Sequence, residues 1–211
     1  MIKTWKNLTP ADKIKHVILY LIGVGIMPLG VVLTINAHLG SGGYDALNFA
    51  LSDFFKINTS ITIYGTAFII LIITAVIRRG FPRFQTFISS LLLGLSTDLW
   101  KFVFNGIEGT EIITRVIMFT GGTLIIGFAV ACYMLSIFPT NPSDDFLVAM
   151  KEKNVNIGLA KILLDGVCVV LALILRGEIG IGTIICTFGL GPVINIFYKL
   201  VKKTTNIREA V

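Results

Sequence analysis

Hydrophobic residues form long runs along this chain, and short clusters of charged residues separate the runs. Four runs contain no Asp, Glu, Lys or Arg, and they cover residues 17–44, 57–77, 116–143 and 179–198. Each is long enough to cross the roughly 30 Å hydrocarbon core of a bilayer as a helix. Two more runs, at 84–104 and 155–175, are interrupted by a few charges. The pattern predicts an all-α membrane protein, one domain over 1–211, whose six transmembrane helices cover residues 17–37, 59–77, 84–103, 114–137, 157–175 and 180–199.

Two shorter segments follow the first and the fourth of these spans. Residues 44–55 come directly after Gly-Ser-Gly-Gly, and residues 139–150 begin with two prolines. Both segments are too short to cross a bilayer, and the apolar residues of 44–55 recur at helical spacing. We expect each to form a short amphipathic helix that either lies in the membrane interface or enters the membrane as a re-entrant segment.

Composition and charge narrow the class of protein. Hydrophobic residues make up 55% of the chain and charged residues only 14%, with a mean hydropathy of +0.86. This excludes a cytosolic enzyme and a nucleic-acid binder, although the net charge is +6. The basic residues lie beside the hydrophobic runs, where they set orientation. With both termini in the cytoplasm, 14 of the 18 basic residues are cytoplasmic and four are outside, Lys56, Lys101, Arg115 and Arg176.

The two halves of the chain resemble each other. Residues 75–80, Ala-Val-Ile-Arg-Arg-Gly, match residues 172–177, Ala-Leu-Ile-Leu-Arg-Gly, and the same spacing pairs Thr86 with Thr183 and Gly94 with Gly191. Nearer the start of each half the spacing is three residues longer, which pairs Asp45 with Asp145. Apolar helices resemble one another by composition alone, but matched Arg-Gly, Thr and Gly at constant spacing indicate a duplication of residues 15–103 and 114–199.

The number of spans in each repeat has a consequence for the architecture. Three is odd, so two consecutive three-span repeats enter the membrane from opposite sides. The chain is therefore predicted to consist of two inverted three-helix repeats, each with a short helix after its first span. That architecture is typical of transporters that work by alternating access.

The repeat also groups polar residues on two equivalent helices. One face of the third span presents a hydroxyl, a glycine and an acid, and the sixth span presents a hydroxyl, a glycine and an amide: Ser90, Gly94 and Asp98, with Thr187, Gly191 and Asn195. An acid within a span is a candidate for ligand or ion binding because it is costly in contact with lipid. The alternative is helix packing around the two glycines, with Asp98 reaching interfacial water.

Four further polar residues are candidates for a substrate or ion site. Asp165 lies within a span, one helical turn after Lys161, and either carries a proton or cation or forms an ion pair with that lysine. Asp45 and Asp145 open the short helices, where they either cap a helix or guard the ends of a pathway. Asn36, near the end of the first span, either bonds a neighbouring helix or binds a ligand.

The residues needed for catalysis or for a metal site do not occur together in the sequence. The three cysteines, Cys132, Cys168 and Cys186, lie in apolar runs without CxxC spacing, and the two histidines are single residues beside the first span. The sequence therefore predicts that the protein is not an enzyme and that it holds no cofactor and no metal ion.

Several glycine-rich motifs occur in an order that resembles a known family. They are Leu-Gly-Ser-Gly-Gly-Tyr-Asp-Ala-Leu at 39–47, Asp-Asp-Phe-Leu at 144–147, Arg-Gly at 176–177 with Gly180, Gly182 and Thr183, and Gly-Pro at 191–192. In this order they are similar to motifs of the bacterial YczE/YyaS/YitT family of integral membrane proteins. The chain departs from that family at 141–145, where Asn-Pro-Ser-Asp-Asp replaces the usual Gly-Pro-Arg-Asp. The resemblance implies a transporter of poorly defined substrate in the bacterial cell membrane, and it supplies no catalytic residues.

Together these features predict a secondary transporter or exporter of a small solute or ion that works by alternating access. Two alternatives stay open at this stage, a substrate-binding membrane subunit of an ATP-driven vitamin importer and an intramembrane lipid-modifying enzyme. The internal repeat argues against the first, and the missing nucleophile and metal ligands argue against the second. The expected partners are the lipid bilayer and the substrate, with a homodimer left open.

Overall fold

The computed structural model describes residues 8–155, 157–177 and 179–205. Lys3, Lys6 and Arg208, which contribute to the predicted charge asymmetry, lie outside them. Every regular element in this described part is a helix. In chain order the helices are α2 (Pro10–Asn36), α3 (Gly43–Phe55), α4 (Thr59–Arg78), α5 (Gln85–Val103), α6 (Ile112–Leu135), α7 (Pro142–Glu152), α8 (Ile157–Ile174) and α9 (Ile181–Thr205).

The long helices agree with the predicted spans, and α3 and α7 agree with the predicted short helices. The largest differences are at the start of α2 and the end of α9. The start of α2 is moved outward by its cap, because the Thr9 hydroxyl accepts a hydrogen bond from the Asp12 backbone N–H and Pro10 suits the first helical position. The helices α2 and α9 thus continue through the charged residues that mark the ends of the hydrophobic runs.

Among the described residues, four helices are long and apolar enough to cross a membrane: α2, α4, α6 and α9. The other two long helices are less uniform, since α5 contains Asp98 and Lys101 and α8 contains Lys161 and Asp165. Large apolar side chains are exposed on the outside of the bundle, among them Val76, Leu95 and Ile181. An exposed apolar surface of this extent is typical of contact with lipid.

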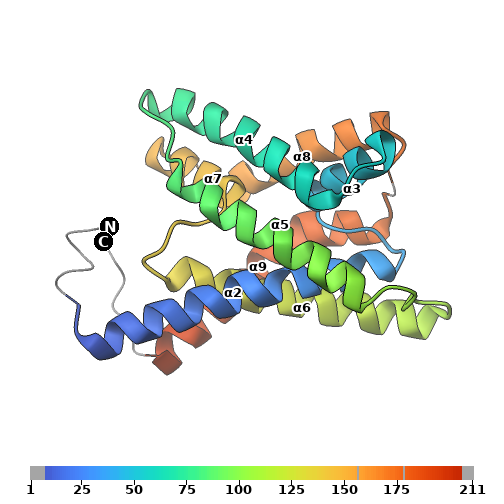
Figure 1. Cartoon of the computed structure of the whole chain (residues 1–211), viewed down its shortest axis with the longest axis horizontal. Helices are drawn as coiled ribbons and strands as arrows, with labels where there is room; N and C mark the ends of the chain where they lie inside the picture. Colours follow the sequence, from blue (N-terminus) through green and yellow to red (C-terminus); the bar gives the residue numbers. More distant parts are fainter. Residues whose placement is uncertain (1–7, 156, 178, 206–211) are drawn as a thin grey trace.

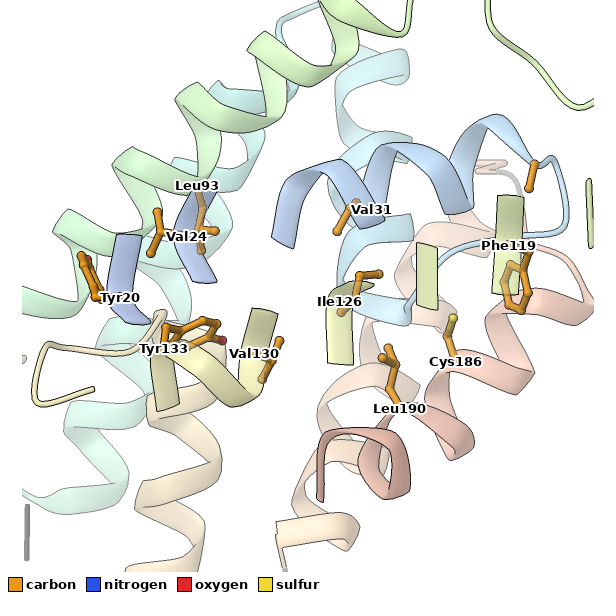
Figure 2. Close-up of a cluster of buried hydrophobic side chains, with 11 residues drawn as sticks. Tyr20, Val24, Val31, Leu93, Phe119, Ile126, Val130, Tyr133, Cys186 and Leu190 are labelled. Atoms are coloured by element: carbon orange, nitrogen blue, oxygen red, sulfur yellow. The ribbon is translucent and has the colours of Figure 1, made fainter. Parts of the chain in front are cut away.

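The core forms around two antiparallel helices, α2 and α6. Gly30 of α2 faces Gly122 and Ile126 of α6, while Gly23, closer to the start of α2, faces Tyr133, closer to the end of α6. A Cβ on Gly30 would lie 2.7 Å from the Gly122 carbonyl oxygen, so the backbones approach closely here. Figure 2 shows the surrounding apolar cluster, with Leu93 of α5 on one side and Leu190 of α9 on the other.

The two halves of the chain are interlocked rather than side by side. The first-half helix α3 packs against second-half α8, and second-half α7 packs against first-half α4. The other main contacts also occur in pairs: α2 with α5 and α6 with α9, α4 with α5 and α8 with α9, and α3 with α4 and α7 with α8. Figure 1 shows α3 and α7 toward opposite ends of the molecule. Each of these helix contacts therefore has a counterpart in the other half.

Candidate functional site: a buried acidic cavity

A small cavity lies where the long helices reach about half of their length. Met27 of α2, Ile126 of α6, Asp165 of α8 and Leu190 of α9 all line it. We call it the central cavity, and its remaining lining residues are Gly42, Tyr44, Asp45, Val130, Ser143, Asp144, Leu147, Lys161, Leu164 and Ile194. It combines one polar side, formed by α3, α7 and α8, with apolar walls from α2, α6 and α9.

The two short helices begin at this cavity. Asp45 is the third residue of α3 and Asp144 is the third residue of α7, and both side chains line the central cavity. The Asn141 carbonyl starts α7 by accepting hydrogen bonds from the backbone N–H groups of Asp144 and Asp145, at 3.0 and 2.9 Å. An acid in the first turn is favourable because the helix N-terminus carries partial positive charge. Two positive helix ends and two acids therefore meet in the middle of the molecule.

Side-chain hydrogen bonds hold α3 against α4. The Tyr44 hydroxyl lies 3.0 Å from the Thr66 hydroxyl, which donates to Asn48 Oδ1 at 2.6 Å. Asn48 and Thr66 are buried, and the Asn48 backbone carbonyl also accepts from Thr62 at 2.8 Å. Satisfied buried polar groups of this kind fix the position of a helix that is too short to be stable alone.

A glycine brings the start of α3 directly onto α8. A Cβ on Gly43 would lie 2.6 Å from the Asp165 carbonyl oxygen, so only glycine fits at this position. The contact places the first turn of α3 beside the acid at the middle of α8. The glycine-rich run at 40–43, read from the sequence as the entry of a short helix, thus also sets the distance between α3 and α8.

Asp165 and Lys161 form the ion pair that their spacing predicts. Lys161 Nζ donates to Asp165 Oδ2 at 2.9 Å, one helical turn apart on α8. Asp165 is fully buried, and its second oxygen, Oδ1, has no hydrogen-bond partner. The lysine therefore satisfies half of this carboxylate and leaves the other half unpaired inside the protein.

The charges around the cavity do not balance. Asp45, Asp144 and Asp165 bring three carboxyl groups, whereas Lys161 is the one basic side chain among the described residues that line the cavity. Its charge acts on both Asp45 and Asp144, as does that of Asp165. The Tyr133 hydroxyl of α6 donates a hydrogen bond to Asp144 Oδ2. With all groups ionised, the side chains carry two negative charges more than positive ones.

Two further cavities lead from the central cavity toward one end of the molecule. Met27, Tyr44 and Asp45 line both the central cavity and a second cavity, which also contains Asn48 and Phe49. Phe49 in turn lines a third, larger cavity with Asn36, His38, Asp53, Lys101 and Glu108, which we call the end cavity. Lys101 Nζ lies 4.9 Å from the Phe49 ring centroid. Phe49 is therefore shared by the end cavity and the second cavity, which reaches Asp45.

An ion-pair cluster lies beyond the other side of the central cavity, between α4 and α7. Arg78 donates to Asp145 at 2.5 and 3.0 Å and to Glu152 at 2.8 Å, and Arg83 lies 3.4 Å from Asp145. The hydrogen bonds from Arg78 lower the pKa of the Glu152 carboxyl below its ordinary value. Asp145 is thus bound to two arginines and is not among the residues that line the central cavity. The predicted pairing of Asp45 with Asp145 needs correcting, since the residue that shares the helix position and the cavity of Asp45 is Asp144.

The predicted group on α5 and α9 is not brought together around one ligand. Asp98 is half-buried on α5, whereas Asn195 is exposed on α9, and neither lines the central cavity. Gly94 allows close approach of the Tyr64 ring of α4, which agrees with helix packing, but a Cβ on Gly191 would have nothing within 4 Å. A binding role for Asp98 and Asn195 stays a prediction.

The remaining candidates make local contacts. Ser90 donates to Asn141 Oδ1 at 3.2 Å, which ties α5 to the residue before α7. Thr187 donates to the Thr183 carbonyl of its own helix, at 2.8 Å. Asn36 donates to the carbonyls of Phe104 and Ile107, at 3.3 and 2.9 Å, and also lines the end cavity. The alternative of hydrogen bonding to a neighbouring segment therefore describes Asn36.

Sequence reasoning missed Asp144 and Tyr133 as parts of the site. Asp144 has a signal in the sequence, because it is third in its helix as Asp45 is, but two adjacent acids leave the alignment ambiguous. Tyr133 has none, since an apolar run with a single tyrosine looks the same whichever way the hydroxyl faces. Within the described part of the chain, no group of three or more His, Cys, Asp and Glu side chains is placed to hold a metal ion.

Comparison with known proteins supplies the family. A family described only as a family of unknown function (DUF6198) matches residues 14–199, most of the chain. The chain belongs to this family. The DUF6198 match thus covers α3 to α8 in full and most of α2 and α9.

Three relatives extend this assignment. The chain is 31% identical to the uncharacterised protein YyaS of Bacillus subtilis (strain 168) over 188 residues, covering 87% of this chain and 92% of YyaS. It is 24% identical to the uncharacterised membrane protein YczE of the same strain, over 64% of this chain and 62% of YczE. An uncharacterised protein of Haemophilus influenzae is 23% identical over 92% and 88% of the two chains. The resemblance to YyaS and YczE is confirmed, whereas that to YitT stays a prediction. No solved structure matches this chain.

Proposed function

We propose that this DUF6198 protein is a secondary transporter of a small solute in the bacterial cell membrane, that it works by alternating access, and that it is not an enzyme. The central cavity carries the proposal. It lies at half the length of the long helices, it is bounded by elements of both halves, and the N-termini of two short helices open into it. Substrate sites of secondary transporters have these features.

The relation between the halves supports an inverted repeat. The antiparallel packing of α2 and α6 requires an odd number of crossings between their starts, as three-span repeats do. In the proposed arrangement α5 and α8 are the third and fifth of six spans, and α3 and α7 are re-entrant helices. Lys15 Nζ of α2 donates to the Thr205 carbonyl at the end of α9, at 3.0 Å, so the first and last helices share one end of the molecule. We assign that end to the cytoplasm, because most basic residues belong there under the positive-inside rule.

The surroundings of the central cavity differ between its two sides. They support a conformation in which access to the cavity is closed on one side and nearly open on the other. The ion-pair cluster closes the α4–α7 side with buried charges on Arg78 and Asp145, whose side chains are 11% and 9% exposed. On the opposite side we take Phe49 as the barrier, because it lines both the end cavity and the second cavity, which reaches Asp45. Alternating access requires that these two barriers open in turn.

Cysteine labelling from each side tests this mechanism. In a background without Cys132, Cys168 and Cys186, a single Ser143→Cys in the central cavity should be labelled mainly from the side of the end cavity in proteoliposomes. Adding Asp145→Asn weakens the ion-pair cluster, so labelling from the α4–α7 side should rise while labelling from the opposite side falls. Adding Glu111→Gln, at an exposed position before α6, should change neither rate.

The possible outcomes separate the candidate functions. Opposite changes on the two sides support alternating access. A rise on both sides would indicate a channel, and no change on either side would indicate a static binding subunit or an enzyme.

A parallel comparison of Asp98→Asn with Asp165→Asn in ligand-dependent thermal shifts identifies which acid belongs to the binding site, because ligand that binds the native state raises its apparent stability.

A further inference from the structure

The unpaired oxygen of Asp165 gives information about the ligand. A buried carboxylate oxygen without a partner is costly, and native proteins rarely leave one unless a ligand or an ion completes it. Asp165 is fully buried, its Oδ1 accepts no hydrogen bond from the described residues, and the residue lines the central cavity. A carboxylate oxygen can only accept, so the group that completes it is a donor.

The charges around this oxygen favour a cation over an anion. Three carboxyl groups line the cavity and one lysine opposes them, and that lysine already donates to Asp165 Oδ2. An anionic ligand would add a like charge to this group, whereas a cation would restore the balance. The partial positive charges of the two helix N-termini reduce the excess negative charge without removing it.

The shape of the charge distribution favours an organic cation over a bare metal ion. Asp45, Asp144 and Asp165 line one cavity, yet the described residues contain no set of three such groups converging as metal ligands do. The opposite walls are apolar, formed by Ile126, Val130, Leu190 and Ile194 among others. An ammonium group fits the polar side, and a short alkyl chain fits these walls.

We infer that the central cavity binds a small primary ammonium ion with an apolar body, whose N–H groups donate to Asp165 Oδ1 and neighbouring carboxylates, in exchange for a proton. The inference rests on the proposed transport function and names its substrate class. Three carboxyl groups that share one buried cavity with a single lysine cannot all be ionised at low cost when the cavity is empty, so one of them holds a proton. When the ammonium ion binds, that O–H bond breaks and the proton leaves, so one positive charge replaces another.

The other titratable groups around the acids set the limits of this exchange. Those around the three acids come from six helices: Tyr44 on α3, Arg78 on α4, Tyr133 on α6, Asp145 on α7, Lys161 and Cys168 on α8, and Cys186 on α9. The basic groups among them are already paired, Lys161 with Asp165 and Arg78 with Asp145. The carboxyl groups are therefore the ones left to exchange a proton.

Binding of four matched probes to the purified full-length protein tests the inference. n-Butylammonium should bind, tetramethylammonium should bind at least tenfold more weakly because it has no N–H donor, and butyrate and Na⁺ should not compete. The affinity for n-butylammonium should fall by up to about tenfold per unit decrease in pH while one proton is displaced per ion bound. Binding in weakly buffered solution should release about one proton per n-butylammonium.

Two variants locate the effect. Asp165→Asn should weaken n-butylammonium binding at least tenfold, but it also leaves Lys161 without its partner and so can unfold the protein. Asp45→Asn avoids this problem, because Asp45 makes no direct ion pair among the described residues, and it should both weaken binding and remove the proton release. Glu111→Gln is the matched control and should bind as the unaltered protein does.

Failure of the inference is distinguishable from failure of the proposed function. Equal binding of tetramethylammonium would show that the ligand needs no N–H donor, and binding of butyrate that depends on Asp165 would show that the ligand is not a cation. Either result would overturn the inference, but the central cavity would remain the proposed substrate site. Binding of n-butylammonium unaffected by Asp45→Asn would place the ion elsewhere and overturn the inference. If no probe binds while Ser143→Cys labelling still alternates between sides, the transporter stands and the substrate class is wrong.

Discussion

Asp144 and Asp145 are adjacent in sequence but have different partners. Successive residues of a helix point about 100° apart, so in the first turn of α7 one acid faces the central cavity and the other faces Arg78 of α4. One residue step thus separates a carboxyl group available to a ligand from one held in an ion-pair cluster. The two acids should respond differently to substitution.

Asp145→Asn should lower the stability of the folded protein. The Asp145 carboxylate is buried and bonds two arginines, so its loss leaves the Arg78 charge with Glu152 alone. Removal of one partner from a buried pair costs about 3 kcal/mol. The melting temperature in detergent measures the effect, with Asp144→Asn as the comparison. An equal loss in both variants would mean that Asp144 is as structural as Asp145.

The contribution of Glu152 to stability should depend on pH. Because Arg78 lowers the pKa of Glu152 in the folded state, the interaction is fully present above the ordinary glutamate pKa of about 4.3 and is lost as the pH falls through the lowered value. Melting curves of the unaltered protein and Glu152→Gln should therefore differ at pH 7 and converge as the pH falls below the ordinary glutamate pKa. A difference that stays constant with pH would show that the charge of Glu152 contributes nothing.

The sequence predicts part of the site and leaves the rest undetermined, for reasons visible in single residues. The Lys161–Asp165 pair follows from helical spacing, and Asp45 follows from its place at a helix start. The choice between Asp144 and Asp145 depends on a one-residue register that two identical neighbours cannot fix. The direction of the Tyr133 hydroxyl and the unpaired oxygen of Asp165 depend on contacts between helices far apart in the chain.

At the scale of single helices, the sequence predicts the elements well because the hydrophobic runs and their boundaries are sharp. Glycine and proline mark the starts of α3 and α7, and each long helix overlaps most of the residue range predicted for one span. What the periodicity does not give is which helices touch. The contacts of α3 with α8 and of α7 with α4 join opposite halves, and no local pattern encodes them.

Two glycines of α2 should differ sharply on substitution by alanine. Gly30→Ala places a methyl group against backbone atoms of Gly122 and Ile126, 2.7 and 2.9 Å away, which α6 cannot relieve without moving. Overpacking of this kind costs about 1–3 kcal/mol. Gly25→Ala meets nothing within 4 Å and should be neutral or stabilise by up to about 1 kcal/mol through helix propensity.

Melting temperatures and resistance to protease measure this comparison. Gly30→Ala should melt below the unaltered protein and Gly25→Ala at or above it. If both substitutions were neutral, the close crossing of α2 and α6 would not contribute to the stability of the fold.

At the scale of the whole molecule, the proposed orientation can be tested by labelling from outside the cell. In the cysteine-free background, single cysteines at Arg83 and Lys203 should resist a membrane-impermeant thiol reagent on intact cells, and one at Glu108 should react. All three positions are exposed in the structure, so failure to react reflects the side of the membrane. Labelling of the Arg83 position from outside would contradict six spans with cytoplasmic termini.

The interlocked packing of the halves also has a consequence for biosynthesis. The N-terminus of α3 rests on Asp165, which the ribosome adds only in the second half of the chain. At 5–20 residues per second, α3 waits on the order of ten seconds between its own synthesis and that of its support. During that interval the first turn of α3 lacks Asp165, the residue against which Gly43 packs. The first half of the nascent chain therefore cannot complete its packing until α8 is inserted. The helices that are made last complete the structure of the first half.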